Sequence, residues 1–393
     1  GGVYHEILNT LEKIKKYNSD NLKFSIIVTS KKLDINLENE NIELHYFSMN
    51  AIERYICYLR NYGTLVSRLK KLFFFQNKFE NFLKKINVDI VYFPSASQYS
   101  LYLEDIKFII NIGDINHREN IEFPEVVNSS EFQRKDDIFK KSLPKALAII
   151  TNASIIKKRI CFFYGILEER IFLVNLHPSN SVKNFKDIDK TKQKEVREIF
   201  KLPKNYIFYP AMYLPHKNHK NLVDALKILK LNFKIDLKMV FCGSDNDVNY
   251  LKNLKKYVSK NNLDNSIIFL NFVDDDQLPY LYLDALLLAM PTLMGPANIP
   301  PWEAFKMEVP VVYSELEGIK EVFGDATFYI DHLKPESIAN GIKEIFENTE
   351  LRNNLIIKGK KRLSQIDYKT EFEQFFKIIK KYRNLKQVWE FDN

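Results

Sequence analysis

Short apolar runs alternate along the chain with longer segments in which apolar residues recur every three or four positions. The first pattern is typical of buried strands and the second of helices that cover a sheet. In the first half, strands are predicted at 23–29, 89–93, 107–112, 147–151 and 171–175. Helices are predicted there at about 4–17, 51–86, 130–144 and 154–164. This alternation favours βαβ units built on a parallel sheet.

The second half repeats the alternation after a polar, lysine-rich stretch, 179–204, which we interpret as a linker with a short helix. Strands are predicted at 205–210, 237–242, 266–271, 285–290, 309–313 and 327–330. Helices are predicted at 219–232, 247–261, 276–283, 300–307 and 335–348, and 351–384 is helical and basic. Two such series predict an α/β protein with two Rossmann-like, doubly wound domains that face a cleft.

The composition supports large folded cores and excludes several protein classes. Hydrophobic residues make up 46% of the 393 residues, with only 11 glycines and 14 prolines, so the chain is neither disordered nor collagen-like. Cys57, Cys161 and Cys242 are far apart, so neither a disulfide framework nor a thiolate zinc site is expected. No long uncharged apolar run and no signal peptide are visible, which predicts a cytoplasmic protein without a transmembrane helix.

The net charge of +8 is concentrated in one segment, 54–85, which has eight Lys or Arg against one acid, Glu80. Its local charge is therefore +7, and aromatic residues separate the cations. The segment is either a helix pair with its aromatic residues in the core, or a surface for an anionic membrane or an anionic acceptor. A contact with nucleic-acid phosphates is the third alternative, and we expect no nucleic-acid partner.

Loops that follow predicted strands carry the candidate chemistry, because open α/β sheets bind ligands at the carboxyl ends of their strands. After strand 205–210, Lys217 lies between His216 and His219 in a loop before a helix. A cation and backbone amides in such a loop are able to hold a diphosphate. A solvated loop without a ligand is the alternative.

A second loop follows strand 285–290. Gly295 allows a ligand to approach the backbone closely, and the N–H groups beyond it lie at a helix start, which suits an anion. Glu303, about one turn into that helix, is able to accept hydrogen bonds from ribose hydroxyls. The alternative is a plain helix start.

Two further clusters of charged residues stand out. After strand 107–112, Asp114, His117 and Arg118 gather at the strand end, which suits general acid–base work or contact with sugar hydroxyls. The second cluster, 274–276, is an Asp-Asp-Asp triplet. We interpret the triplet as a helix cap rather than a metal site, because acids are favourable at a helix start.

Together these residues resemble the retaining glycosyltransferases of family 4, the glycosyl transferases group 1, which have the GT-B fold. In that family EGFGLPxxEA, then GxPVVxS and ExxGDA, mark the donor site, and GPANIPPWEAF, MEVPVVYS and EVFGDA stand here at matching spacing. The resemblance implies that Glu303 holds the ribose. Gly295 stands where many members have a glutamate that contacts the sugar. The form GPxNIPPxEAF is similar to a subgroup of bacterial polysaccharide transferases.

The resemblance extends to the other loops. Lys217 matches the family's diphosphate-binding lysine, whereas Met212 stands where the family has an arginine. Residues 113–125 are similar to the subgroup's WDxxHRxxPEFPE segment. The implied catalytic residues are His117, Lys217 and Glu303. The implied donor-binding residues are Gly2, Arg118, Met212, His216, Asn218, Ser244, Gly295, Pro296, Ala297, Asn298 and Ile299.

The reaction that the resemblance implies is transfer of a sugar from a UDP- or GDP-type donor to a hydroxyl of a glycan or lipid-linked acceptor. Retention at the anomeric carbon is implied, with no metal or other cofactor. We expect an acceptor-side domain at 1–185, a donor-binding domain at 186–370 and a C-terminal helix, 371–393, that returns to the first domain. If 54–85 binds lipid, the protein is peripheral on the inner face of the cell membrane.

Two other functions stay open. One is a nucleotide-sugar epimerase on the same fold. The other is a non-catalytic module that binds a nucleotide sugar or a glycan, which Gly295 and Met212 motivate because they replace residues that the family uses.

Overall fold

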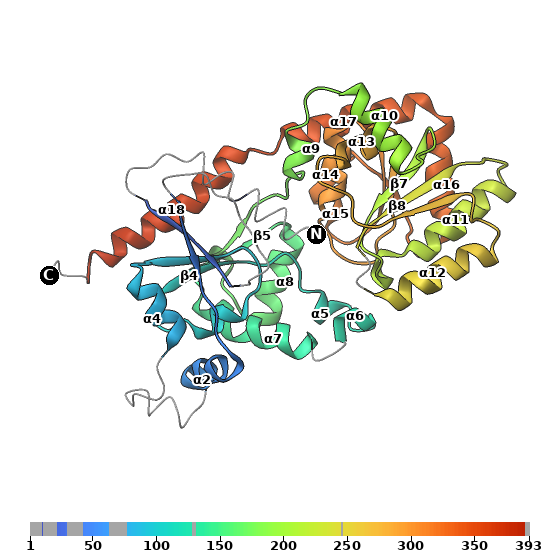
Figure 1. The fold of residues 1–393 in the computed structure, drawn as a ribbon. Coiled ribbons are helices and arrows are strands. Elements are labelled where there is room, and N and C mark those ends of the chain that lie inside the picture. The colour runs from blue at the N-terminus through green and yellow to red at the C-terminus, as the bar shows by residue number, and fades with distance from the viewer. Residues whose placement is uncertain are drawn as a thin grey trace.

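The computed structural model describes residues 10, 22–29, 42–62, 77–127, 131–244 and 247–389. Two α/β halves lie side by side, each with helices packed around parallel strands (Figure 1). The predicted helix at 4–17 lies outside the described residues, apart from Thr10, and so does Gly2.

The second half contains one six-stranded parallel sheet in the order β12-β11-β10-β7-β8-β9. Its strands are β7 (Tyr206–Pro210), β8 (Lys238–Cys242), β9 (Ile267–Leu270), β10 (Ala285–Met290), β11 (Val311–Ser314) and β12 (Phe328–Ile330). The first and fourth of these strands, β7 and β10, pair directly. The chain therefore winds outward in opposite directions from this pair, which is the switch point at which such sheets bind ligands.

Helices cover both faces of this sheet (Figure 1). They are α9 (Asn180–Lys183), α10 (Lys190–Ile199), η6 (Pro215–Lys217), α11 (His219–Leu231), α12 (Val248–Lys260), α13 (Leu278–Leu283), α14 (Ile299–Lys306), α15 (Ile319–Phe323), α16 (Pro335–Glu347) and α17 (Thr349–Ser364). The linker predicted at 179–204 thus contains two helices, α9 and α10. The triplet 274–276 precedes α13, whose N-cap is Gln277, and Asp276 pairs instead with Lys192 at 2.5 Å.

The first half contains a four-stranded parallel sheet, β3-β4-β5-β6, and a separate parallel pair, β1-β2. The strands are β1 (Phe24–Val28), β2 (Ile42–Tyr46), β3 (Ile90–Phe93), β4 (Lys107–Asn111), β5 (Ala148–Thr151) and β6 (Ile171–Leu173). The strand β2 was not predicted from the sequence. The residues of β2 alternate as Ile-Glu-Leu-His-Tyr, so the period-two signal of a half-exposed strand was present.

Helices of the first half pack around these strands, and α5 and α6 lie on the side that faces the second half (Figure 1). They are α2 (Ala51–Tyr62), α4 (Lys78–Lys85), η2 (Gln98–Tyr102), α5 (Asn116–Glu119), α6 (Pro124–Val127), α7 (Glu131–Ser142), η4 (Leu143–Lys145), α8 (Ser154–Tyr164) and η5 (Glu168–Arg170). α5 and α6 follow β4 and contact α7, so the loop after β4 is anchored to a longer helix.

The prediction of one helix over 51–86 is wrong, because α4 begins at a cap of its own. The Asn77 side chain accepts a hydrogen bond from the Glu80 N–H at 3.1 Å. The Glu80 carboxylate accepts one from the Asn77 side-chain amide at 3.4 Å. The first of these bonds satisfies a backbone N–H group that a helix start leaves free, and the second holds the Asn77 side chain in place. The residues between α2 and α4, 63–76, lie outside those described.

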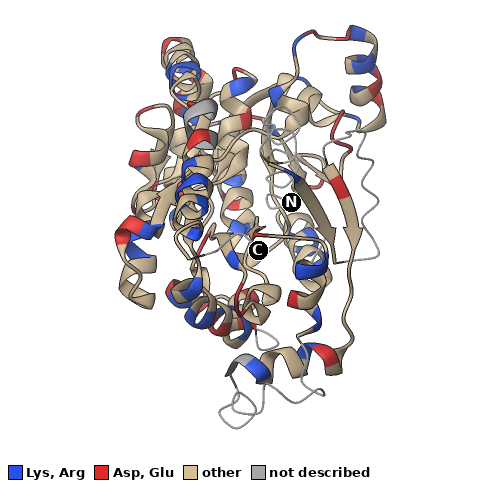
Figure 2. Ribbon diagram, turned by 90° about the vertical axis from the view of Figure 1, so that its left-hand side faces the viewer, with Lys and Arg blue, Asp and Glu red and all other residues tan. Residues whose placement is uncertain are grey.

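The segment 54–85 is closer to neutral in space than in sequence. Cations and acids lie interspersed over the surface of the molecule (Figure 2). Three described cations of the segment form ion pairs with acids nearby: Arg60 with Glu104, Lys78 with Glu53, and Lys84 with Asp105. Of its described aromatic residues, Tyr58, Phe79 and Phe82 pack in or against the core, whereas Tyr55 is 61% exposed. The described part therefore favours the helix-pair interpretation, while Lys70 and Lys71 lie outside it.

The last helix, α18 (Tyr368–Lys386), returns to the first half as expected (Figure 1). Ile378 is buried in a cluster with Ile109, Ala148 and Ile150 of β4 and β5. The Phe375 ring meets the ring of Tyr92 on β3 with centroids 5.2 Å apart. No helix among the described residues has both the length and the apolarity to span a membrane. The domain bounds at 185 and 370 stay predictions.

The packing of α18 can be tested with Ile378→Ala. Deleting a buried isoleucine side chain costs lost burial and leaves a cavity, so we expect the free energy of unfolding to fall by about 2–3 kcal/mol. Urea denaturation followed by circular dichroism measures the change. Ile357→Ala on α17, where the side chain is 65% exposed, is the matched control and should shift stability by less than ~0.5 kcal/mol. An equal loss in both variants would contradict the contact of α18 with the sheet.

Candidate active site

Three loops converge at the switch point between β7 and β10. The loop after β7 contains His216 and Lys217, the loop after β10 contains Asn298, and the segment after β4 reaches them with Glu125. The His216 carbonyl accepts hydrogen bonds from the Leu293 N–H at 2.8 Å and the Thr292 hydroxyl at 3.3 Å. The two loops of the second half are therefore fastened to each other beside the first half.

Lys217 is a half-buried cation at the centre of these loops. Its Nζ lies 3.5 Å from the side-chain oxygen of Asn298, the limit of a hydrogen bond. Burial lowers the pKa of Lys217 to about 8, although the carboxylates of Asp114 and Glu125 act in the opposite direction. The structure thus brings the predicted Lys217 and Asn298 together, with carboxylates of the first half close enough to influence the lysine.

The loop after β10 turns at Gly295 and is held by Asn298. Gly295 has φ +90°, a conformation that a residue with a side chain adopts only under strain. The family's glutamate would therefore strain the loop at this position. The Asn298 side-chain amide donates to the Gly295 carbonyl at 2.9 Å and to the Tyr313 hydroxyl at 2.6 Å. These bonds orient Asn298 Oδ1 toward Lys217.

The helix start beyond this loop offers fewer N–H groups than the sequence analysis assumed. α14 begins at Ile299, and Pro300 and Pro301 follow, neither of which has an N–H. The Asn298 side chain makes no capping bond to the helix. An anion at this end would therefore meet the N–H groups of residues up to Ile299, not a full first turn of the helix. Pro296 and Ile299 are buried, and Ala297 is half-buried.

His216 fastens the two halves together. Its backbone N–H donates to Glu125 Oε1 at 3.0 Å, and its Nδ1 lies 2.6 Å from the same oxygen. Burial alone would raise the pKa of Glu125, but the bonds from His216 outweigh it, so that pKa is lowered. Burial also lowers the pKa of His216, against the opposing effect of Glu125. His216 therefore contacts a carboxylate of the first half rather than facing open solvent.

A second contact between the halves lies at Gly318, before α15. A Cβ atom at Gly318 would lie 2.7 Å from Cβ of Ile155 on α8, so only glycine permits this approach. Next to it, Arg159 of α8 pairs with Glu119 of the first half and, at 2.9 Å, with Glu317 of the second. The two halves are thus joined by direct contacts at His216 and at Gly318.

Glu303 is buried, with 3% of its surface exposed, on the second turn of α14. Its Oε1 accepts a hydrogen bond from the Ser179 N–H at 3.2 Å, and its Oε2 accepts one from the Tyr282 hydroxyl at 2.7 Å. Burial and the nearby Glu303 carboxylate raise the pKa of Tyr282, which keeps it a neutral donor. Each carboxylate oxygen has a further lone pair that is able to accept a hydrogen bond from a ligand hydroxyl.

The remaining donor-loop residues are held mostly through their backbone. The Asn218 side chain donates to the carbonyls of Pro291 and His332 at 2.9 and 2.8 Å, so its amide joins loops together. The Ser244 carbonyl accepts from the Tyr213 N–H at 3.3 Å, and the Met212 carbonyl accepts from the Leu214 N–H at 2.9 Å. These bonds fix the path of the chain after β7 and β8.

Comparison with known proteins identifies the second half. Residues 189–362 match the family model described as glycosyl transferases group 1. This part of the chain is a glycosyl transferases group 1 domain. The motifs at Gly295–Ile299 and Glu303, and the loop with Lys217, all lie within the matched region.

Two curated relatives have names that refer to bacterial surface polysaccharides. The O-antigen chain mannosyltransferase RfbU of Salmonella typhimurium is 26% identical over 208 residues, which is 53% of either chain. The capsular polysaccharide biosynthesis glycosyltransferase CapH of Staphylococcus aureus is 23% identical over 345 residues, 86% of either chain. The aligned stretch thus spans only about half the length of RfbU.

A solved structure shows the same fold over almost the whole chain. HepE of Anabaena, in complex with UDP and glucose, has a TM-score of 0.69 at 16% identity and covers 97% of this chain and 96% of its own. The GT-B architecture expected from the sequence is therefore confirmed, including the first half that the group 1 domain does not contain.

His117 lies apart from the loops of the group 1 domain. Its side chain is fully buried, with Nε2 2.8 Å from the Tyr164 hydroxyl and the ring edge-on to Phe139. Burial lowers the pKa of His117 to about 4, so the ring is neutral near pH 7. The buried ring is held by Tyr164 and Phe139, so a contact with a sugar or an attacking hydroxyl would require the ring to become accessible. The catalytic role of His117 stays a prediction.

Arg118 is likewise engaged within the first half. Its guanidinium bonds to Asp136 on α7, with Nε 2.7 Å from Oδ1, and lies over the ring of Phe132. Asp136 also accepts from Tyr164 at 3.2 Å. A contact of Arg118 with the donor would compete with this buried carboxylate for the guanidinium, and its donor-binding role stays a prediction. Through Asp136 and Tyr164, Arg118 is joined to His117.

Sequence reasoning missed several partners that complete the site. Tyr282 and Ser179 hold Glu303, Tyr313 holds Asn298, and Glu125 holds His216. Tyr313 and Glu125 stand inside motifs that the resemblance already matched, so the motif boundaries were a usable signal. Tyr282 and Ser179 lie 21 and 124 positions from Glu303, and nothing local marks them.

His219 lies behind the lysine loop in an aromatic cluster. It is fully buried, its two ring nitrogens have no hydrogen-bond partner, and the rings of Tyr209 and Phe241 lie 4.9 and 5.1 Å away. Burial, with a smaller effect of Lys217, lowers the pKa of His219 to about 3. The residue is therefore a neutral core histidine that supports the loop after β7.

His219 predicts acid sensitivity. Between pH 6.5 and about 3 the unfolded state binds a proton on this histidine and the folded state does not, so stability falls as the pH falls. From pH 7 to pH 5 the histidine should remove about 2 kcal/mol. We expect His219→Phe to abolish that part of the loss in urea denaturation at the two pH values. Tyr250→Phe, in the same cluster, is the control and should retain the full loss; an unchanged loss in His219→Phe would refute the assignment.

Proposed function

We propose that the protein transfers a sugar from a nucleoside diphosphate sugar to an acceptor hydroxyl, with retention at the anomeric carbon and without a metal ion. The observation that carries the proposal is the convergence of Lys217, Asn298 and Gly295 at the β7/β10 switch point of a group 1 domain. This is the place where a doubly wound sheet binds a nucleotide.

The leaving diphosphate gains negative charge as the glycosidic bond breaks. Lys217 supplies a positive charge, and the N–H groups of residues 295 and 297–299 supply dipoles that need no reorganisation. The Lys217 pKa of about 8 leaves the ammonium charged at pH 7, and a bound diphosphate would raise that pKa further. His216 has its Nδ1 committed to Glu125, so the proposal gives it a role in holding the loop.

Glu303 is assigned to the ribose. Its carboxylate is fixed from two directions by Tyr282 and Ser179, which orients the remaining lone pairs without further loss of side-chain freedom. A carboxylate held in this way accepts hydrogen bonds from a ribose hydroxyl pair with little entropic cost.

In this proposal, protein groups rather than a metal ion stabilise the negative charge of the leaving diphosphate. Within the described ranges, no group of three or more His, Cys, Asp or Glu side chains is placed to hold a metal ion. In the triplet 274–276, Asp276 is committed to Lys192. Lys217 and the loop amides are the groups left to balance the diphosphate.

The similar proteins suggest the substrate classes. RfbU is named an O-antigen chain mannosyltransferase and CapH a capsular polysaccharide glycosyltransferase, and HepE was solved with UDP and glucose. We propose a UDP- or GDP-type donor and a glycan or lipid-linked acceptor of a bacterial surface polysaccharide. A cytoplasmic location, peripheral on the inner face of the cell membrane, belongs to the same proposal.

A stepwise assay tests the proposal. Thermal shift with UDP, GDP and their sugars first identifies the donor, because a ligand of the folded state raises its melting temperature. Donor turnover with a glycan acceptor pool is then followed by proton NMR in EDTA. The same anomeric configuration in donor and product supports retention, and full rate in EDTA supports metal independence. An inverted product, a rate that requires added Mg²⁺, or epimerised donor without acceptor would each overturn the corresponding part.

Lys217 gives the most direct test of the nucleotide site. Lys217→Ala removes a charged hydrogen bond to phosphate and should weaken binding of the identified nucleoside diphosphate by about 1.5–3 kcal/mol. Lys217→Arg retains the charge and should bind within about 1 kcal/mol of wild type. Isothermal titration calorimetry measures both.

The same titration has a pH dependence. Wild-type affinity should decline as the pH rises through about 8, where the free lysine loses its proton, whereas Lys217→Arg should show no decline between pH 7 and 9.5. Unchanged affinity in Lys217→Ala, or the same decline in both proteins, would remove Lys217 from the site.

A further inference from the structure

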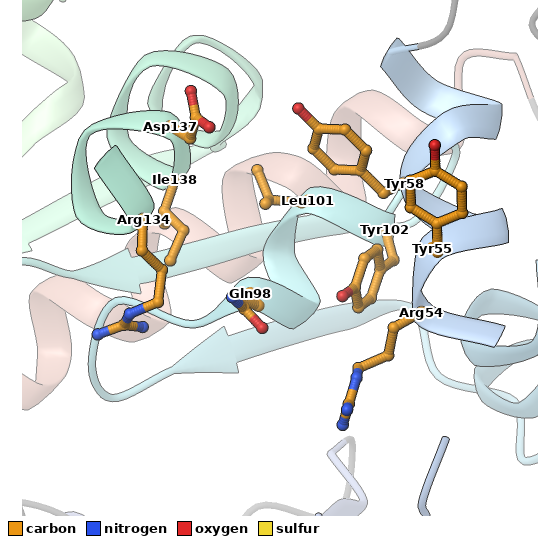
Figure 3. Close-up of a pocket in the computed structure, with 9 residues that line it drawn as sticks. All are labelled: Arg54, Tyr55, Tyr58, Gln98, Leu101, Tyr102, Arg134, Asp137 and Ile138. Atoms are coloured by element: carbon orange, nitrogen blue, oxygen red, sulfur yellow. The ribbon is translucent and has the colours of Figure 1, made fainter. Parts of the chain in front are cut away.

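The first half contains a pocket of about 270 Å³ between α2, η2 and α7 (Figure 3). α2 and α7 form opposite sides, and residues of η2 lie between them. Its volume is just below the ~300 Å³ at which sites for small molecules usually begin. The space suits one sugar-sized unit and is too small for a nucleoside diphosphate sugar.

The lining combines aromatic rings with hydrogen-bonding groups. Tyr55 and Tyr58, three residues apart, project from the same face of α2, and Tyr102 of η2 lies between the helices (Figure 3). Gln98 supplies an amide and Asp137 a carboxylate. Tyrosine rings pack on the C–H faces of a pyranose while their hydroxyls and the amide bond its hydroxyl groups.

Arg54 gives the pocket its charge. The Arg134 guanidinium is neutralised by Glu131 at 2.5 Å, and Asp137 lies 3.5 Å from Lys141. Arg54 is exposed and forms no ion pair with any residue in the described ranges. A guanidinium without an ion pair among the described residues, on the Tyr102 side of the pocket, is suited to a carboxylate or phosphate group on a sugar (Figure 3).

α7 connects this pocket to the residues that follow β4. Asp136 of α7 bonds to Arg118 and Tyr164 on the side of His117, whereas its neighbours Arg134 and Asp137 line the pocket. The pocket therefore lies one helix away from the residues that follow β4. A chain that presents a hydroxyl at the cleft would reach the pocket with another of its units.

We propose that this pocket binds a sugar unit with an anionic substituent, carried by the acceptor glycan at a position other than the one that receives the donor sugar. The identification of this ligand as part of the acceptor rests on the proposed function. The recognition itself depends only on Arg54, the tyrosines and Gln98.

The test uses the full chain and three probes: methyl β-D-glucuronide, its neutral counterpart methyl β-D-glucoside, and inorganic phosphate. Saturation-transfer NMR titrations measure the affinity for each. We expect the glucuronide to bind about tenfold more tightly than the glucoside, which is the gain from one charged hydrogen bond, and phosphate to bind more weakly than the glucuronide. Equal binding of glucuronide and glucoside, or of glucuronide and phosphate, would overturn the assignment to an anionic sugar.

Variants on α2 locate the binding. Arg54→Ala and Tyr55→Ala should each weaken glucuronide binding about tenfold. The control, Ile52→Ala, alters a side chain on the same helix that is 71% exposed and does not line the pocket, and it should bind as wild type does. Melting temperatures of the three variants should match wild type. A loss in Ile52→Ala equal to that in Tyr55→Ala would refute the location.

Thermal shift with the nucleoside diphosphate separates this proposal from the proposed function. All three variants should retain the wild-type nucleotide shift, because the pocket lies outside the β7/β10 loops. Loss of glucuronide binding with the nucleotide shift intact supports the pocket. Absence of any nucleotide shift in wild type would sink the acceptor assignment even if the glucuronide binds, and absence of glucuronide binding would sink the pocket alone.

Discussion

The reversal of strand order between β7 and β10 is the constraint on which the site depends. The two strands are neighbours, but the connections that follow them run toward opposite edges of the sheet. No crossover connection of the sheet in the described part of the chain therefore covers the carboxyl ends of β7 and β10. The lysine loop and the Gly295 loop fill that position, and the Asn298 side chain connects them. Glycine at φ +90° is what lets the second loop turn back far enough for Asn298 to do so.

The first half completes the site through polar contacts rather than through a shared sheet. Glu125 bonds both the backbone and the ring of His216, the residue next to Lys217. Any change in the position of α6 is thereby transmitted to the loop that carries the cation. The buried cluster of His117, Arg118, Tyr164 and Asp136 keeps the segment after β4 in place, which gives its charged residues a role without contact with substrate.

The sequence predicted the sheets and loops well and the side-chain partners poorly. Apolar runs located the strands of the second half within one or two residues, because buried parallel strands are continuous and apolar. The half-exposed strand β2 was not predicted. The helices α2 and α4 were predicted as one helix, because periodicity alone does not reveal the Asn77 cap. Lys217 and Asn298 were placed in the same site by motif spacing. The burial of His117 was not predicted, because a histidine beside charged residues looks the same in sequence whether it is buried or exposed.

Arg159 is shared by carboxylates of different exposure, Glu119 at 18% and Glu317 at 74%. If the halves separate along this edge, Arg159 retains its inner partner and loses only the outer one. An exposed pair of this kind contributes about 0–1 kcal/mol, so its loss adds little to the cost of opening this edge. In the proposed reaction, an opening along this edge during nucleotide release would break the outer pair alone, and Arg159, still held by Glu119, would be in place to bond Glu317 again.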